Sequence, residues 1–150
     1  MIRTRTDGFS LVEVMIVAGL VTVLAAMSVP TITAGMRRYS LISASQQVVS
    51  TIRAARSQAV GKNATLRVRF NYPADGQYQI LDEADAAVGG VQYLPGGADF
   101  GDVSGDLEFS TSGRVTALSG VAPVTIVVSN GDDDQNKTIT VSASGRVQLP

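Results

Sequence analysis

The sequence contains no cysteine, no histidine and no tryptophan among its 150 residues. Without cysteine the chain can form neither disulfides nor a thiol nucleophile. Without histidine it lacks Ser-His and Cys-His catalytic pairs and the usual zinc ligand sets. Neither a P-loop nor a G-x-G-x-x-G motif is present, and no two carboxylate, lysine or tyrosine side chains stand at a spacing that indicates catalysis. We therefore expect neither an enzyme nor a protein that holds a metal or another cofactor.

Charge is also scarce near the N-terminus, where residues 9–29 contain a single charged residue, Glu13. As a helix, with a rise of about 1.5 Å per residue, this apolar stretch is about 31 Å long, enough to cross the core of a bilayer. A carboxylate there costs about 2.5–3.5 kcal/mol near the bilayer centre, which indicates a function with a specific partner. Two simpler interpretations are a plain single-pass anchor and a capping box, in which Ser10 and Glu13 act on their own helix.

The residues around Glu13 form a specific motif. Residues 8–13 read Gly-Phe-Ser-Leu-Val-Glu, and Pro30 follows the apolar stretch. This arrangement closely resembles the processing site of type IV prepilins and type II secretion pseudopilins. The resemblance implies a leader peptide of residues 1–8, cleavage after Gly8 by a prepilin peptidase, and methylation of the new amine at Phe9. It also implies that Glu13 pairs with this amine, its own or that of the subunit below, during assembly.

The same resemblance implies a location in the bacterial inner membrane. Residues 9–29 would cross the membrane once and form the filament core, with the head outside the cytoplasm, in the periplasm of a Gram-negative cell. Basic residues do not fix this orientation, because Arg3 and Arg5 precede the apolar stretch while Arg37 and Arg38 follow it. The expected partners are other pilins or pseudopilins, prepilin peptidase and the inner membrane.

A second helical pattern occupies residues 30–61. Small and apolar residues recur every three or four positions and predict one apolar stripe on an otherwise polar helix. The stripe consists of Leu41, Ala44, Val48, Ile52, Ala55 and Ala59. Gly61 is expected to end the helix. Pro30 is expected to kink it between its apolar and amphipathic halves, or alternatively to begin a fresh helix.

Residues 62–150 change to the alternation that is typical of strands. Leu66, Val68 and Phe70 alternate with Arg67 and Arg69, which predicts a half-buried strand. Further strands are expected at residues 77–80, 106–109, 115–118, 124–128 and 138–141, with loops over residues 82–105 and a tight turn at residues 130–131. We therefore predict an α+β protein, in which a long N-terminal helix packs on a mostly antiparallel β-sheet head.

Opposite charges are segregated along the chain. Residues 37–69 contain seven bases and no acids, whereas residues 70–150 contain eleven acids and three bases, so the two regions carry +7 and −8. Three interpretations fit the basic region: a solvated helix face near an anionic membrane, a surface complementary to the acidic head of another subunit, or a nucleic-acid footprint.

A short segment occurs twice, 32 residues apart. Residues 109–115 read FSTSGRV and residues 141–147 read VSASGRV. Each copy is explained locally as a Ser-Gly turn followed by an exposed arginine and a new strand. Paired Gly-Arg turns also resemble the head of the H-type pseudopilins, GspH, and of the related FimT and FimU minor pilins. Some FimT-like proteins bind DNA through a Gly-Arg-x-Arg stretch, but Gln148 stands here in place of the second arginine.

The resemblance therefore predicts an H-type minor pseudopilin of a type II secretion system, a structural subunit of the pseudopilus or of its tip complex. The alternative within the family is a FimT/FimU-like minor pilin of a type IV pilus that contributes to DNA uptake. The alternative outside the family is a membrane anchor with a solitary β head. Contacts with DNA or a partner are assigned to Arg67, Arg69, Arg114 and Arg146. Weak DNA binding is expected, because the acids of the head repel phosphate.

Overall fold

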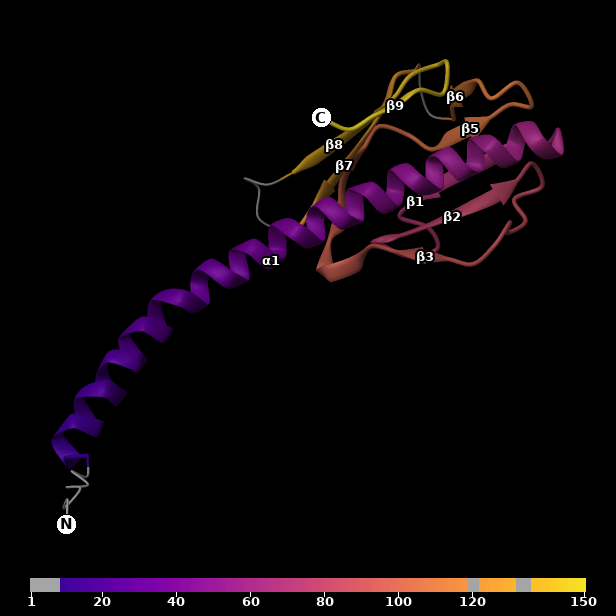
Figure 1. The fold of residues 1–150 in the computed structure, drawn as a ribbon. Coiled ribbons are helices and arrows are strands. Elements are labelled where there is room, and N and C mark those ends of the chain that lie inside the picture. The colour runs from indigo at the N-terminus through magenta and orange to yellow at the C-terminus, as the bar shows by residue number, and fades with distance from the viewer. Residues whose placement is uncertain (1–8, 119–121, 132–135) are drawn as a thin grey trace, which may run out of the picture. The chain divides into compact units, whose positions relative to one another are not determined.

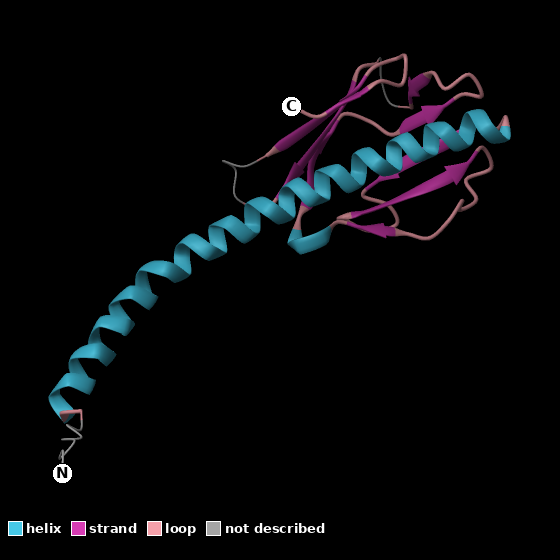
Figure 2. Cartoon of the chain, in the orientation of Figure 1, coloured by secondary structure: helices cyan, strands magenta, loops and turns pink. Residues whose placement is uncertain are grey.

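The computed structural model describes residues 9–118, 122–131 and 136–150, and it describes no side chains for residues 27–32 and 34. The described elements are one long helix, α1 (Leu11–Lys62), the strands β1 (Leu66–Phe70), β2 (Gln77–Asp82), β3 (Gln92–Tyr93), β4 (Asp99–Val103), β5 (Leu107–Phe109), β6 (Val115–Ala117), β7 (Val124–Ser129), β8 (Lys137–Val141) and β9 (Val147–Gln148), and a short 3-10 turn η1 (Pro95–Gly97) (Figures 1 and 2). The chain divides into two compact units, residues 1–36 and 37–150, so that α1 contributes to both.

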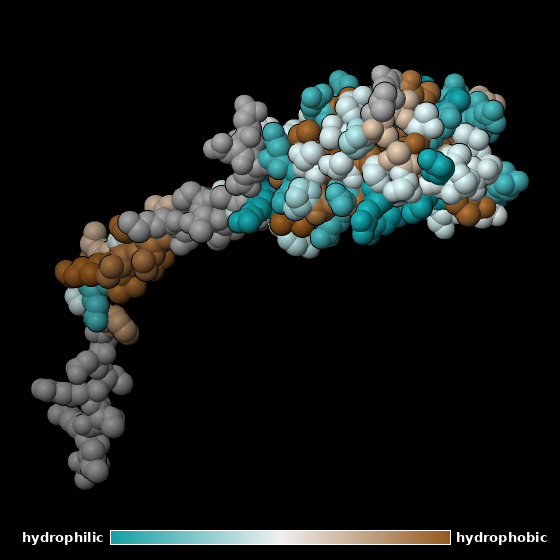
Figure 3. Space-filling model, turned by 90° about the horizontal axis from the view of Figure 1, so that it is seen from above, coloured by the Kyte–Doolittle hydropathy of each residue, from teal (hydrophilic) through white to brown (hydrophobic). Residues whose placement is uncertain are grey.

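The described part of the first unit is helical from Leu11 onward and exposes its apolar side chains. Figure 3 shows an almost continuous hydrophobic surface on these residues. Exposed fractions range from 53% at Val17 to 81% at Phe9 among the large apolar residues of this segment. Within the described residues, the structure contains no helix that is both long enough and apolar enough to cross a membrane.

The second unit contains two antiparallel sheets. The first sheet has the order β3-β2-β1-β5-β6, and the second has the order β4-β7-β8-β9. The second half of α1 lies along both sheets (Figure 1). All six residues of the predicted stripe are buried, from Leu41 to Ala59, and Val49 is buried beside them. The predicted amphipathic helix and α+β architecture are therefore confirmed.

The helix ends one residue later than predicted, and a different residue ends it. Asn63, with φ = 50°, takes the left-handed conformation with which helices commonly end. The amide of Ala64 donates to the carbonyl of Ala59 at 3.1 Å, and the amide of Asn63 donates to that of Val60 at 3.3 Å. These bonds satisfy the last carbonyls of the helix. Asparagine adopts this left-handed conformation more readily than most residues other than glycine.

The strands predicted from alternation are present. In β1, Leu66, Val68 and Phe70 are buried, while Arg67 and Arg69 lie on the other face. The prediction of loops throughout residues 82–105 is wrong, because this region contains β3, η1 and β4. In β4, Gly and Asp residues hid the strand signal, and the register shifts between Phe100 and Val103.

One further detail of the second sheet differs from the prediction. The prediction of a tight turn at residues 130–131 is wrong, since β7 ends at Ser129 and β8 begins only at Lys137. Strand β9 follows the second copy of the repeated segment, where a new strand was expected, and its two residues pair with the end of β8.

Aromatic residues join the two sheets. The Phe100 ring of β4 lies edge-on to the rings of Phe70 and Tyr78, with centroids 5.3 and 5.6 Å apart. The hydroxyl of Tyr78 is buried and has no hydrogen-bond partner within the described part of the chain. Burial raises the pKa of Tyr78 above its usual value. Weak polar contacts with the side chains of Thr51 and Gln47 oppose this shift, but neither has the geometry of a hydrogen bond.

Candidate assembly surfaces

The N-terminal motif lies in the first unit. Phe9 and Glu13 are exposed, while Gly8 lies outside the described residues. The amides of Glu13 and Val14 donate to the backbone oxygen of Ser10 at 3.0 and 3.2 Å. Among the described residues, neither the Ser10 hydroxyl nor the Glu13 carboxylate has a hydrogen bond, so the structure does not form the side-chain contacts of a capping box. The carboxylate of Glu13 is therefore available to a partner.

The helix continues through position 30. Its bounds, Leu11–Lys62, include Pro30 without interruption, so no fresh helix begins there. A kink at Pro30 stays a prediction.

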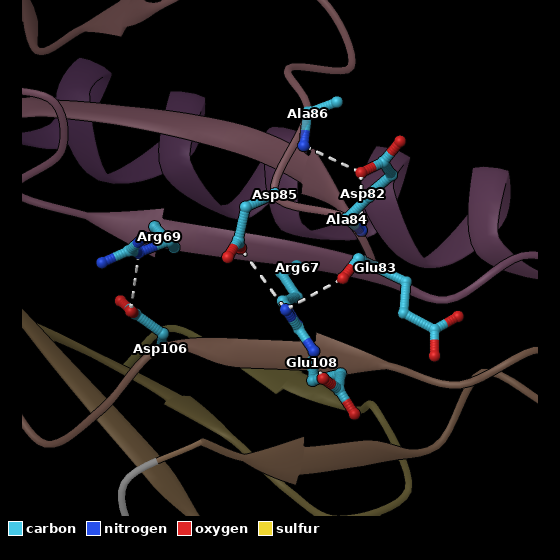
Figure 4. A network of polar contacts seen from close by, with 9 residues as sticks. All are labelled: Arg67, Arg69, Asp82, Glu83, Ala84, Asp85, Ala86, Asp106 and Glu108. Carbon is cyan, nitrogen blue, oxygen red and sulfur yellow. Dashed lines mark hydrogen bonds and ion pairs between the residues drawn. The ribbon is translucent and has the colours of Figure 1, made fainter.

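Two of the four arginines assigned to partner contacts are occupied within the head. Arg67 Nε donates to Glu108 Oε2 at 2.8 Å, and its Nη1 lies 3.3 Å from Asp85 Oδ1 (Figure 4). The hydrogen bond with Glu108 raises the pKa of Arg67, and the negative charges of Glu108 and Asp85 act in the same direction. Arg69 pairs with Asp106 at 3.4 Å. These ion pairs balance charge between the basic and acidic regions of one chain.

Arg69 has a second neighbour. Its guanidinium carbon lies 4.4 Å from the centroid of the Tyr72 ring, a cation–π arrangement. Arginines held by carboxylates and a ring have fewer free donors for phosphate, which weakens the case for a nucleic-acid footprint on this face of β1.

The two copies of the repeated segment form matching turns. In the first, the amide of Ser110 donates to Arg114 O at 3.0 Å and the amide of Gly113 donates to Ser110 O at 2.8 Å. In the second, Ser142, Arg146 and Gly145 make the same two bonds at 3.0 and 2.8 Å. We call residues 110–114 and 142–146 the twin turns. One closes the β5–β6 hairpin and the other closes the β8–β9 hairpin, so each sheet contributes one turn.

The twin turns lie side by side against α1. Arg56 Nε donates to Gly113 O at 3.0 Å, and Arg56 Nη2 donates to Ser144 O at 3.1 Å. The amide of Val115 also donates to Ala143 O at 3.0 Å, which joins the turns directly. One guanidinium of the helix thus contacts a turn of each sheet.

This packing requires glycine. A Cβ at Gly145 would lie 2.5 Å from Gly113 O and 2.6 Å from Arg56 Nε, and Gly145 has φ = 77°. Gly113, at φ = 73°, is less restricted, because its Cβ would meet the Val60 side chain at 3.0 Å. Sequence reasoning found the repeat but not the role of Arg56. The available signal was an arginine off the apolar stripe together with two identical turns.

The arginines of the twin turns face solvent. Arg114 and Arg146 are exposed, and no ion pair with either is formed among the described residues. No group of three or more acidic side chains in the described ranges is placed to hold a metal ion. The acidic run at residues 132–134 lies outside them.

Two family profiles match the sequence. The family described as type II transport protein GspH matches residues 44–145, more than half of the chain. The prokaryotic N-terminal methylation motif matches residues 3–29. No curated protein matches the chain significantly.

The fold is similar to that of two solved proteins. The type IV minor pilin FimU of Pseudomonas aeruginosa superposes with a TM-score of 0.61 at 19% identity, over 75% of this chain and 90% of that chain. The minor pseudopilin EpsH from the Type 2 Secretion System of Vibrio cholerae superposes with a TM-score of 0.53 at 19% identity, over 73% of this chain and 94% of that chain. At this identity the similarity shows a shared fold.

Proposed function

Since the chain belongs to the GspH family of type II transport proteins, we propose that it is a minor pseudopilin of a type II secretion system. Its work is structural: it is a subunit of the pseudopilus or of the complex at the pseudopilus tip. The observation that carries this proposal is the family match over residues 44–145, which includes part of the amphipathic helix half and Gly113 and Gly145 of the twin turns.

The methylation motif and the family together make the chain a membrane-anchored, pilin-like protein. We propose that residues 9–29 cross the inner membrane once before assembly, with the head in the periplasm. Prepilin peptidase would cleave after Gly8 and methylate Phe9. The free carboxylate of Glu13 supports a role in pairing with that amine, because an ion pair offsets the desolvation of a lone carboxylate in an apolar core.

A second candidate function is that of a minor pilin in a type IV pilus, which the fold similarity to FimU favours. DNA uptake is the less favoured extension of this candidate. Arg67 and Arg69 are paired with carboxylates, and Gln148 follows Arg146 where a second arginine would be needed. Deletion of the gene separates the candidates: a secretion defect with normal pilus function supports the pseudopilin, and the reverse supports the pilin.

Processing provides the most direct test. Mass spectrometry of the mature protein should find an N-terminus at Phe9 that carries a methyl group, and Gly8→Ala should abolish it. Gly19→Ala is the matched control, because a Cβ at Gly19 meets nothing within 4 Å and cleavage should proceed normally. An intact Met1 terminus in cells with an active prepilin peptidase would refute the proposal.

A further inference from the structure

A shallow notch lies between the end of α1 and the first twin turn. It has a volume of about 590 Å³ and is lined by Arg53, Arg56, Ser57, Val60, Gly61 and Ser112. Two of these residues are arginines, two carry hydroxyl groups, and none is acidic. Arg53 and Arg56 are three residues apart on the helix and are therefore neighbours on its surface, so both can face one bound group.

Arg56 is held in place for binding. Its Nε and Nη2 atoms are used by the turn carbonyls, while its Nη1 atom makes no hydrogen bond within the described residues. The guanidinium is thus fixed and still has donors to offer. A preorganised arginine loses less conformational freedom on binding a carboxylate than a mobile one does.

The notch also has an apolar side. Val60 is 50% exposed, and the space around the Cα of Gly61 is open, with no atom within 4 Å of an added Cβ. Beyond this edge, the exposed Arg114 and Arg146 add positive charge at the ends of the twin turns. The surface therefore combines fixed guanidinium groups with a position for one apolar side chain.

We propose that this notch binds an acidic segment of a neighbouring filament subunit, with a carboxylate on Arg53 and Arg56 and an adjacent apolar side chain on Val60. The proposal rests on the proposed function, since it names the kind of partner surface that assembly brings to the head. Guanidinium groups bind carboxylates well because two N–H donors can contact the two carboxylate oxygens at once.

The observations favour protein over nucleic acid as the occupant. Arg114 and Arg146 extend the positive charge beyond the notch, but residues 70–150 contain eleven acids against three bases, and these acids repel a polyanion. At physiological ionic strength the Debye length is about 8 Å, so an isolated carboxylate interacts with the notch while the acids elsewhere on the head are largely screened. A long phosphate backbone would meet those acids directly.

The test uses the full-length chain in a non-ionic detergent and fluorescence anisotropy. The probe is a short labelled peptide in which Glu and Val alternate, compared with its Gln-Val counterpart and with a single-stranded oligonucleotide. The Glu peptide should bind at least about tenfold more tightly than the Gln peptide. Arg53→Gln should weaken binding about tenfold, whereas Arg38→Gln, an exposed arginine on the same helix outside the notch, should not. Arg53 suits this test because no hydrogen bond or ion pair of its side chain to the twin turns is found within the described ranges.

Three outcomes would overturn the proposal. These are equal binding of the Glu and Gln peptides, equal binding by the Arg53→Gln and Arg38→Gln proteins, and tighter binding of the oligonucleotide with loss on Arg53→Gln. The last would make the notch a nucleic-acid site. Because the peptide assay needs no assembly, normal processing at Phe9 with no peptide binding would reject the notch and leave the pseudopilin assignment intact.

Discussion

Tyr78 has a buried hydroxyl that makes no hydrogen bond of good geometry in the described structure, while its ring contacts Phe100 of the other sheet. A buried, unsatisfied polar group costs about 1–3 kcal/mol. We therefore expect Tyr78→Phe to keep or raise the free energy of unfolding, by up to about 1 kcal/mol, as measured by urea denaturation. Tyr93→Phe, at a position 63% exposed, should change nothing.

The free energy of unfolding measured at alkaline pH provides the control for this prediction. Because the folded chain raises the pKa of Tyr78, the unfolded chain releases the phenol proton first. The contribution of Tyr78 to stability is thus complete below about pH 10 and decreases as pH rises above it. Tyr78→Phe should reduce the loss above pH 10. A marked destabilisation by Tyr78→Phe at neutral pH would show that the hydroxyl has a partner.

Gly145 sits at a close approach between the twin turns and Arg56. We expect Gly145→Ala to destabilise the protein by about 2–4 kcal/mol, because the substitution combines left-handed strain with overpacking against Gly113 O. Gly131→Ala is the matched control: φ is 75° there, but nothing within the described structure lies within 4 Å of the added Cβ. It should cost only about 1–2 kcal/mol. If thermal denaturation showed equal losses of stability for Gly145→Ala and Gly131→Ala, the close packing of the twin turns would contribute nothing to stability.

At the scale of elements, the end of α1 depends on Asn63 rather than Gly61. Asn63→Gly should leave the free energy of unfolding unchanged or higher, whereas Asn63→Val should lower it by about 1–2 kcal/mol. Gly61→Ala distinguishes the two residues, since helical alanine is more favourable than glycine by about 1 kcal/mol. A loss of stability in Gly61→Ala would show that Gly61, rather than Asn63, ends the helix.

The predictable elements are those with a strong period. Leu41 to Ala59 follow the helical repeat and β1 follows strict alternation, so both were assigned from sequence. Strand β4 was missed because Asp99, Gly101 and Asp102 lack strand propensity, and pairing with β7 overrides this preference. The hydrogen bonds of Arg56 could not be predicted, because their partners lie 57 and 88 residues away in the sequence. The pairing of Arg67 with Glu108 depended likewise on strand register.

At the scale of the whole molecule, Glu13 is the residue on which assembly is expected to depend. Glu13→Leu should insert into the membrane at least as well as wild type, because a carboxylate leaves the apolar segment. Its incorporation into the filament or tip complex should fall, since the amine at Phe9 loses its partner. Membrane fractionation measures the first effect and copurification with the other subunits measures the second.

Glu13→Gln separates charge from shape, because it keeps the size of the side chain and removes the negative charge. It should assemble as poorly as Glu13→Leu. Normal incorporation of both variants would show that Glu13 serves only its own helix terminus.

The single guanidinium that joins the helix to both hairpins has a mechanical consequence. Tension applied along α1 reaches Gly113 of one sheet and Ser144 of the other through the same side chain. The buried apolar stripe of α1 packs on the same two sheets, so Arg56 is one of several attachments through which force passes from the helix to the head. Resistance to force is governed by the rate of unfolding, and we expect the two hydrogen bonds of Arg56 to add to this resistance at the twin turns.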